Sequence, residues 1–424
     1  QDDSPRMKLM RGEVQYKLAR TLASARNPSS GFVSDAMDMY TKSSRSYLEA
    51  IDEGTTRTGA LRGQAACAAA LSDLYREADR FEEARGVLNQ AYERVRGSEQ
   101  TDLRQAGVLL KKRLAAIRVI TCDLDQAERE YKEALAILDA LSEASPGDMA
   151  VALTHADTRI LLSIPLSASG RFDEAEREVR AGLYEGALVI QQLSNASDRV
   201  TMNRAERLVT RAHSALAEVL LAAGRADESV AEFEVAIDRW TAKLSSTPGD
   251  LRVRRFRAPL LSSLALAHLA RDDPAAAGRA AMDALRDVEQ HSIDAPEDPT
   301  LSRHRANALV ALAATHIRAG EFDSAEDALR EAKNIALGLH ASDSGRASHT
   351  KLLGEALTAE ADLLRQRAMS DPGAGRWMTE AINACRSVID HEQRIDPTMS
   401  GCAGSATNRA KTEMWLSELI NASE

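Results

Sequence analysis

The chain of 424 residues contains few aromatic residues and few of the residues that make tight turns. It has 3 Trp, 7 Tyr and 6 Phe, and its 11 prolines and 23 glycines are sparse for a fold built from many short strands. Because sheets favour β-branched and aromatic side chains, this composition argues against an extensive β-sheet. No run of apolar residues approaches the 18 that a membrane-spanning helix needs.

Cysteine is also scarce, and the 54 basic residues are outnumbered by 64 acidic ones. The four cysteines, Cys67, Cys122, Cys385 and Cys402, are scattered, which is neither a disulfide framework nor a metal-binding spacing. Only Cys385 and Cys402 lie close in the sequence, and a disulfide between them requires Cα atoms within about 7 Å. The net charge of −10 argues against a general binder of nucleic acid or anionic membranes, since both need a concentrated basic face.

What the chain does have is an apolar content of 44%, carried mostly by Ala and Leu. This is enough for a large core, and it predicts an almost entirely helical, all-α protein. The start Gln1-Asp2-Asp3-Ser4-Pro5 lacks Met, as after removal of a signal peptide or an N-terminal domain, so a cytoplasmic and an exported location both remain open.

A six-residue turn motif recurs along the chain and defines a repeat. A small or turn-forming residue is followed two places later by a bulky one, then by an acid and a small residue, although the copy at Asp272 is weaker. The copies start 43, 48, 54, 48 and 48 residues apart, at Asp79, Cys122, Gly170, Gly224, Asp272 and Gly320.

The helix predicted before each turn carries a Leu followed by a small residue. The Leu fills the space between helices, and its small neighbour lets a partner helix approach closely. The pair stands eight residues before each turn, at Leu71-Ser72, Leu114-Ala115, Leu162-Ser163, Leu216-Ala217, Leu264-Ala265 and Leu312-Ala313.

The helix predicted after each turn is equally regular. A small residue is followed four places later by a second, mostly larger apolar one, and such i, i+4 positions form one apolar stripe. Acids gather in the first turn, where they suit the positive end of the helix dipole. The stripe pairs are Ala84 and Leu88, Ala127 and Tyr131, Ala175 and Val179, Ser229 and Phe233, Ala277 and Ala281, and Ala325 and Leu329.

With these features the chain resembles the tetratricopeptide repeat family, whose helix A carries a Leu and a small residue and whose helix B carries an Ala after a turn. The resemblance is clear over residues 60–340 and looser over 6–56, where Leu22-Ala23 is the helix A pair, and over 347–395. A helix over 405–422 is expected to cap the last apolar edge. The resemblance implies a single right-handed α-solenoid over 1–424, with about eight antiparallel helix pairs, rather than three domains.

The period of 43 to 54 residues exceeds the 34 residues usual in this family. Each helix is therefore expected to have about 20 residues, roughly 30 Å. Long helices of this kind are similar to the arrays of kinesin light chains and to those that follow the kinase domain of some bacterial serine/threonine kinases. The added residues lie before helix A, around 145–148, 247–250 and 295–299.

No catalytic motif stands out. The sequence has no metalloprotease His-Glu-x-x-His, no phosphate-binding glycine loop, no nucleophile elbow and no kinase catalytic loop. His268 and His316 share a helix A position, but at about 10 Å apart they cannot share a metal ion, so they are expected to pack between helices. We therefore expect a protein that is not an enzyme and needs no cofactor or metal.

The densest basic segment is Arg252, Arg254, Arg255 and Arg257. It is suited to a phosphate or an acidic segment, but the interpretation that we favour is a solvated first helical turn that pairs with acids of nearby helices.

In this family helix A lines the concave surface, and ligand contacts fall at fixed offsets from the Leu-small pair. When these offsets are applied to this sequence, the resulting positions lack the Lys/Asn set that binds a C-terminal carboxylate in chaperone-binding members. The residues in the middle of the surface are aliphatic. Either this patch binds a helix or an extended apolar peptide, or the long helices bury it between repeats. The positions are Asp73, Arg76, Leu109, Lys112, Ala116, Asp157, Ile160, Ile164, Arg211, Ser214, Glu218, Ser262, Leu266, Leu269, Asn307, Val310 and Ile317.

Two functions of different class follow. In the first, the chain is a scaffold that binds a protein or peptide segment of unknown identity on its concave face. In the second, it is the sensory or regulatory repeat region of a larger bacterial signalling protein, such as a serine/threonine kinase. Association of the chain with itself through the aliphatic face is a third possibility.

Overall fold

A computed structural model gives the fold of the chain. It describes residues 4–23, 30–51, 57–78, 80–193, 198–247, 251–294, 300–342, 347–371, 375–394 and 403–423. Within these ranges the secondary structure is helical throughout, as expected for an all-α repeat protein. Among the described helices none is long and apolar enough to cross a membrane.

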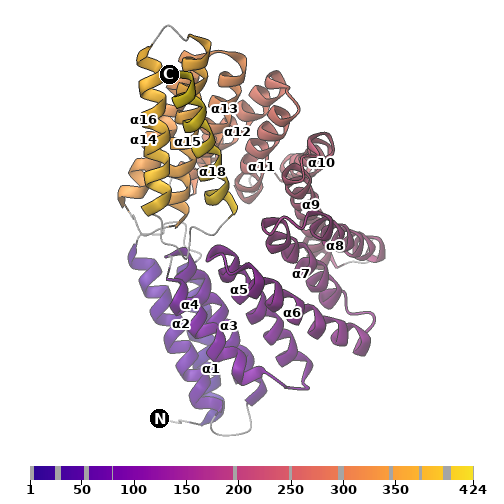
Figure 1. Cartoon of the computed structure of the whole chain (residues 1–424). Helices are drawn as coiled ribbons and strands as arrows, with labels where there is room; N and C mark the ends of the chain where they lie inside the picture. The colour runs from indigo at the N-terminus through magenta and orange to yellow at the C-terminus, as the bar shows by residue number, and fades with distance from the viewer. Residues whose placement is uncertain are drawn as a thin grey trace. The chain divides into compact units, whose positions relative to one another are not determined.

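Helices of about twenty residues follow one another in pairs (Figure 1), which confirms the long-helix repeat. The A helices are α1 (Pro5–Ala23), α3 (Arg57–Glu77), α5 (Thr101–Ile120), α7 (Met149–Ala168), α9 (Arg199–Ala222), α11 (Leu251–Ala270), α13 (Leu301–Ala319) and α15 (Ala347–Ser370). The B helices are α2 (Ser30–Ile51), α4 (Phe81–Val95), α6 (Leu124–Ala144), α8 (Phe172–Leu193), α10 (Ala226–Ser246), α12 (Pro274–Asp294), α14 (Phe322–Ser342) and α16 (Gly375–Arg394). The last described helix, α18 (Ala403–Ser423), packs on α15 and α16 in the position of the predicted cap.

The turns between helix A and helix B that the structure describes in full close in the same way. The residue at the turn has a left-handed backbone at Gly170, Gly224 and Gly320, with φ between 74° and 77°. The next backbone N–H then donates to the carbonyl five residues earlier, for example from Arg171 to Leu166 at 2.9 Å. This geometry satisfies carbonyls that the end of a helix leaves open. Because glycine adopts φ above zero without strain, the glycines of the turn motif have a direct structural role.

Contacts group the chain into two compact units, residues 1–209 and 210–424, with the boundary inside α9. In each unit the core is a series of small clusters rather than one centre. One cluster joins α3, α4 and α5 around Leu88 and Leu114, and another joins α13, α14 and α15 around Leu329. A core assembled between neighbouring helices is the arrangement expected of stacked repeats.

Successive A helices also contact one another within each unit. In unit 1, α1 contacts α3, α3 contacts α5, and α5 contacts α7; in unit 2, α11 contacts α13 and α13 contacts α15. The small residue of each Leu-small pair, buried at Ser72, Ala115 and Ser163, permits this approach. The A helices therefore form the more closely packed layer.

The structure answers the question of the Cys385 disulfide. Cys385 is a buried free thiol, so the bond to Cys402 that the sequence left open is not formed. Cys402 itself lies outside the described residues, as do parts of the loops expected before α11 and α13 and of the turn before α16.

Candidate functional site

The candidate surface is the open side of the A helices, and its register is counted from the repeated Leu. The position two residues after the Leu is exposed in several repeats, with 44% of Ile164 and 46% of Leu266 accessible to solvent. Glu218 has the same position on α9 and is also exposed. These side chains point away from the neighbouring helices, because two residues, or a rotation of about 200° around the helix axis, separate them from the buried Leu.

The position two residues before the Leu points into the packing instead. Ile160, Ser214 and Ser262 all stand there and all are buried. Ser214 donates to the carbonyl of Thr210 at 3.1 Å, and Ser262 donates to that of Ala258 at 3.3 Å. Ile317, five residues after its Leu, is buried as well. For these four residues the expected exposure on the concave face is wrong, because neighbouring helices cover them.

The other candidate positions are open to different degrees. Leu109 and Arg211 are exposed, whereas the remaining ones are half-buried: Asp73, Arg76, Lys112, Ala116, Asp157, Leu269, Asn307 and Val310.

Several charged candidates of unit 1 bind one another across successive A helices. Lys112 of α5 forms a hydrogen-bonded ion pair with Asp157 of α7. Asp73 of α3 pairs with Arg113 of α5 at 3.0 Å and with Arg76 of its own helix at 3.5 Å. These pairs neutralise the charged candidate residues of unit 1 on the open side of the A helices, which is called the inner face below. A ligand on this face therefore meets mainly the aliphatic side chains between the pairs.

In unit 2, desolvation affects two carboxyl groups of the A helices, those of Glu218 and Glu355. Desolvation raises the pKa of the Glu218 carboxyl, although Lys351 of α15 acts in the opposite direction. The side chain is accessible to water, and yet enough protein surrounds it to disfavour its charged form. Lys351 also pairs with Glu355 at 3.8 Å, and desolvation raises the pKa of Glu355 too.

A second set of polar residues lies inside the helix pairs. Three residues before the repeated Leu, helix A carries a basic residue in three successive repeats, and helix B carries a Glu opposite. The pairs are Lys111 with Glu130 at 2.5 Å, Arg159 with Glu178 at 2.7 Å, and His213 with Glu232 at 2.6 Å. In the next two repeats apolar residues replace the charges at the same positions, namely Leu261 with Ala280 and Leu309 with Ala328.

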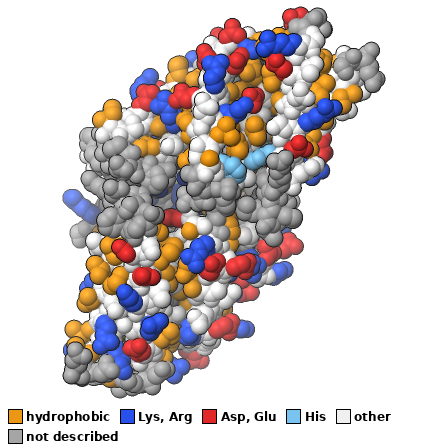
Figure 2. All heavy atoms as spheres, turned by 90° about the vertical axis from the view of Figure 1, so that its left-hand side faces the viewer, with side chains coloured by type: hydrophobic (Ala, Val, Ile, Leu, Met, Phe, Trp, Pro, Cys, Tyr) orange, Lys and Arg blue, Asp and Glu red, His pale blue; other side chains and the backbone are white. Residues whose placement is uncertain are grey.

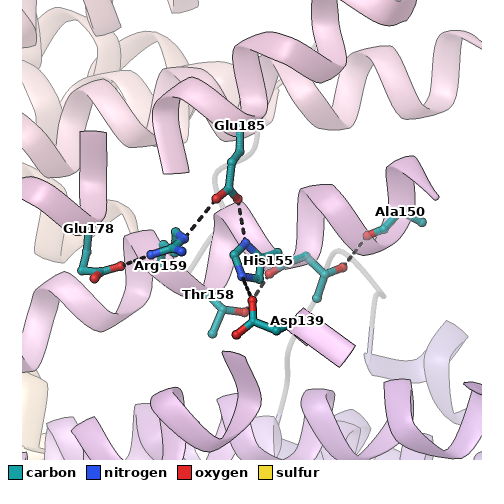
Figure 3. Close-up of polar contacts among 8 residues, drawn as sticks. Asp139, Ala150, His155, Thr158, Arg159, Glu178 and Glu185 are labelled. Carbon is teal, nitrogen blue, oxygen red and sulfur yellow. Dashed lines mark hydrogen bonds and ion pairs between the residues drawn. The ribbon is translucent and has the colours of Figure 1, made fainter. Parts of the chain in front are cut away.

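The most connected of these clusters surrounds His155 (Figure 3). From α7, His155 contacts Glu185 of α8 through Nδ1 at 2.8 Å and Asp139 of α6 through Nε2 at 3.0 Å. Arg159, one turn further, also binds Glu185, at 3.0 Å. The hydrogen bond with Glu185 raises the pKa of His155, while desolvation opposes it. Within the described residues no group of His, Cys, Asp and Glu side chains has the arrangement of a metal site. The contacts of His155 join α7 to α6 and α8.

The arginine segment at the start of α11 agrees with the interpretation that it pairs with nearby acids. Arg257 donates to both carboxylate oxygens of Asp287 at 2.6 Å and to the hydroxyl of Thr241 at 2.9 Å. The side chain of Arg252 lies outside the described residues. On the face drawn in Figure 2, acidic and basic side chains lie interspersed among hydrophobic ones rather than gathered into a field of one sign.

Comparison with known proteins supports the repeat. The family model for the tetratricopeptide repeat matches residues 210–234 and 306–331, and both segments contain a Leu-small pair, a turn and the small residue that follows it in helix B, Ser229 and Ala325. Among curated proteins none matches the chain.

Solved structures show the same kind of fold. The apo form of RapI covers 80% of this chain and 99% of its own, with a TM-score of 0.51 and 11% identity. A Rap protein complexed with Competence and Sporulation Factor covers 98% and 99%, with a TM-score of 0.49 and 12% identity. BtubC (BKLC) from P. vanneervenii covers 60% and 90%, with a TM-score of 0.45 and 18% identity.

Proposed function

We propose that this chain of tetratricopeptide repeats is a protein-interaction scaffold, and that the open side of its A helices binds a peptide or an extended protein segment. The observation that carries the proposal is the exposure of Ile164 and Leu266 at the same position of two A helices. In a protein that buries most of its large aliphatic side chains, such a repeated exposed position is a binding feature.

The inner face suggests the chemistry of the ligand. In unit 1 the exposed Leu109 and Ile164 lie on α5 and α7, the two helices that the Lys112–Asp157 ion pair joins. In unit 2, Leu266 is accompanied by the half-buried Leu269 and Val310. Surfaces of this kind favour a segment with aliphatic side chains at intervals, and the amide of Asn307 and the carboxyl of Glu218 are placed to orient its backbone.

The proposal includes no catalytic step. Several charged side chains of the A helices are held in ion pairs, as Lys112 is by Asp157 and Arg257 is by Asp287. A general acid or base has to reach a substrate, and these pairs direct the charged groups toward the protein.

The test is a screen of an immobilised peptide library with the whole chain and two single variants, Ile164→Asp and Leu266→Asp. A carboxylate at either exposed position is expected to weaken binding of aliphatic peptides by about tenfold or more, since it opposes burial of the ligand there. Using the two variants separately assigns binding to unit 1 or unit 2. Ile160 is unsuitable for this purpose because it is buried.

The matched control is Leu337→Asp, because Leu337 lies on helix B and has a similar exposure of 44%. Peptides bound by the wild type are expected to stay bound by this control. The proposal is wrong if the two A-helix variants, shown to be folded by circular dichroism, retain the same peptides as the wild type.

A further inference from the structure

A hollow lies in unit 1 where the last turn of α4 meets the starts of α3 and α5, and its volume is about 280 Å³. Two buried leucines, Leu61 of α3 and Leu103 of α5, contribute to its lining and belong to the core cluster of these three helices. Polar residues of the turn over 96–100 complete the lining. The hollow therefore has a rigid apolar part and a polar part.

The charged groups of the hollow have one sign. Among the described residues that line it, three are arginines, namely Arg57 of α3, Arg94 of α4 and Arg96 of the turn, and none is Asp or Glu. Arg57 and Arg96 are exposed, and Arg94 is half-buried. In a chain whose net charge is −10, three guanidinium groups around one hollow create a local positive potential that favours an anion.

The contacts of Arg94 and Arg96 leave donors for a ligand. Arg94 donates to the main-chain carbonyl of Gln90 at 3.1 Å, an acceptor without net charge. Arg96 pairs with Glu93 at 3.4 Å, where both side chains are about two-thirds exposed, and a pair so open to water contributes little stability. Each guanidinium has five N–H donors in a planar fork, so both arginines can bind an anion while they keep these contacts.

The neutral polar groups of the hollow also present donors. The Thr58 hydroxyl donates to the side-chain carbonyl of Gln100 at 2.6 Å, so the other end of this amide is its NH₂ group, a donor. The Ser98 hydroxyl oxygen accepts from the backbone N–H of Gln100 at 3.3 Å, and its hydrogen can be donated to a ligand. The bond between Thr58 and Gln100 also ties the start of α3 to the start of α5, which holds the hollow in shape.

The helix ends favour the same charge of ligand, since the starts of α3 and α5 carry the positive ends of two helix dipoles. At α7 the N-cap Asp148 accepts from two backbone N–H groups, whereas the N-cap of α5 is Gln100, whose side chain makes no such bond. The acid in the first turn of α5, Asp102, is paired with Arg62 at 2.8 Å. These features add to the effect of the three arginines.

From these observations we infer that the hollow is a binding site for the phosphate groups of a small molecule, which Arg57, Arg94 and Arg96 contact. Phosphate oxygens accept several hydrogen bonds at once, and the fork of a guanidinium matches them in geometry and charge. The volume of about 280 Å³ is close to the lower end of the roughly 300–1,000 Å³ of ligand sites, which suits a diphosphate or a sugar phosphate. The hollow shares no residue with the inner face, so the two proposals fail or succeed independently.

The probe is inorganic pyrophosphate, and isothermal titration calorimetry measures its binding to the whole chain. The single variants Arg57→Gln and Arg94→Gln are each expected to weaken binding by about tenfold or more, because each removes a charged donor. Arg94→Lys keeps the charge but loses the planar fork, so its affinity is expected to lie between those of the wild type and Arg94→Gln.

The matched control is Arg207→Gln, since Arg207 is an exposed arginine of α9 outside the hollow; it is expected to leave binding unchanged. Circular dichroism checks that each variant is folded. The inference is overturned if pyrophosphate does not bind, or if Arg207→Gln weakens binding as much as the variants of the hollow do, because binding would then follow net charge alone. An acidic peptide that binds more tightly than pyrophosphate, and that the same variants release, would also overturn it in favour of a protein ligand.

Discussion

At the scale of single residues, the charged pairs inside the helix pairs are the feature that local sequence patterns do not reveal. Lys111 and Glu130 are 7% and 5% exposed, and Lys111 also contacts Glu133 at 2.7 Å. Burial opposes the charge of Lys111, but the hydrogen bonds with Glu130 and Glu133 raise its pKa overall. The stability of a protein with such a buried pair falls far more when one partner is removed than when both are replaced by apolar residues.

The variant Lys111→Ala is accordingly expected to lower the free energy of unfolding by about 3–5 kcal/mol, because it leaves Glu130 buried without its cation. The double variant Lys111→Leu/Glu130→Ala reproduces the pair Leu261 and Ala280 of another repeat. It is expected to lie within about 1 kcal/mol of the wild type, or above it. Chemical denaturation measures both values, and equal losses for the two variants would contradict the structural role assigned to the pair.

The pKa of His155 leads to a prediction about pH. The hydrogen bond with Glu185 raises this pKa above the ordinary histidine value of 6.5, against the effect of desolvation; Asp139 also raises it, and Arg159 lowers it. Because the folded-state pKa is the higher one, the stabilisation from His155 is fully present below pH 6.5 and is lost as the pH rises through the folded-state pKa.

The melting temperature of the wild type is thus expected to exceed that of His155→Gln by more at pH 6 than at pH 8.5. Thermal melts of both proteins across this range measure the difference. A difference between the two proteins that does not change with pH would show that protonation of His155 does not contribute.

At the scale of elements, the separation of α7 and α8 depends on a residue without a side chain. A Cβ at Gly182 would lie 2.7 Å from the carbonyl oxygen of Ala156 and 2.9 Å from Cγ1 of Ile160. Helix B approaches helix A closely here, and this approach also explains why Ile160 is buried rather than open to a ligand.

Gly182→Ala is expected to lower the free energy of unfolding by about 1–3 kcal/mol, since the backbone of Ala156 has to move. Gly86→Ala in α4 is the matched control, because a Cβ at Gly86 has no neighbour within 4 Å. That variant is expected to be stabilising by about 0.5–1 kcal/mol, the usual preference of a helix for Ala over Gly. Denaturant titrations that gave both variants the same sign would refute the close approach.

The sequence predicted the elements well because their signals are local. The Leu-small pair, the turn glycine and the Ala of helix B each recur at fixed spacing, and the structure places them at the same points of successive helix pairs. The weaker copy at Asp272 forms the same turn, because Asp272 adopts the left-handed backbone with φ of 61° where three other copies have glycine. Asp and Asn tolerate this region better than most residues.

At the scale of the whole molecule, the fold is a series of helix pairs whose core clusters lie between neighbours. The contacts divide it into two compact units, whereas the single uninterrupted solenoid over 1–424 remains a proposal. Whether the open side of the A helices in either unit binds a peptide is the functional question that this arrangement raises.

The amino-acid sequence by itself determined the helical class, the length and number of the helix pairs and the geometry of the turns, because these depend on residues close together in the chain. Only the tertiary structure decided which helix A positions face solvent. Ile160 and Ile164 are both aliphatic and one turn apart, yet neighbouring helices bury the first and leave the second open. Exposure depends on residues distant in sequence, and periodicity along one helix does not contain that information.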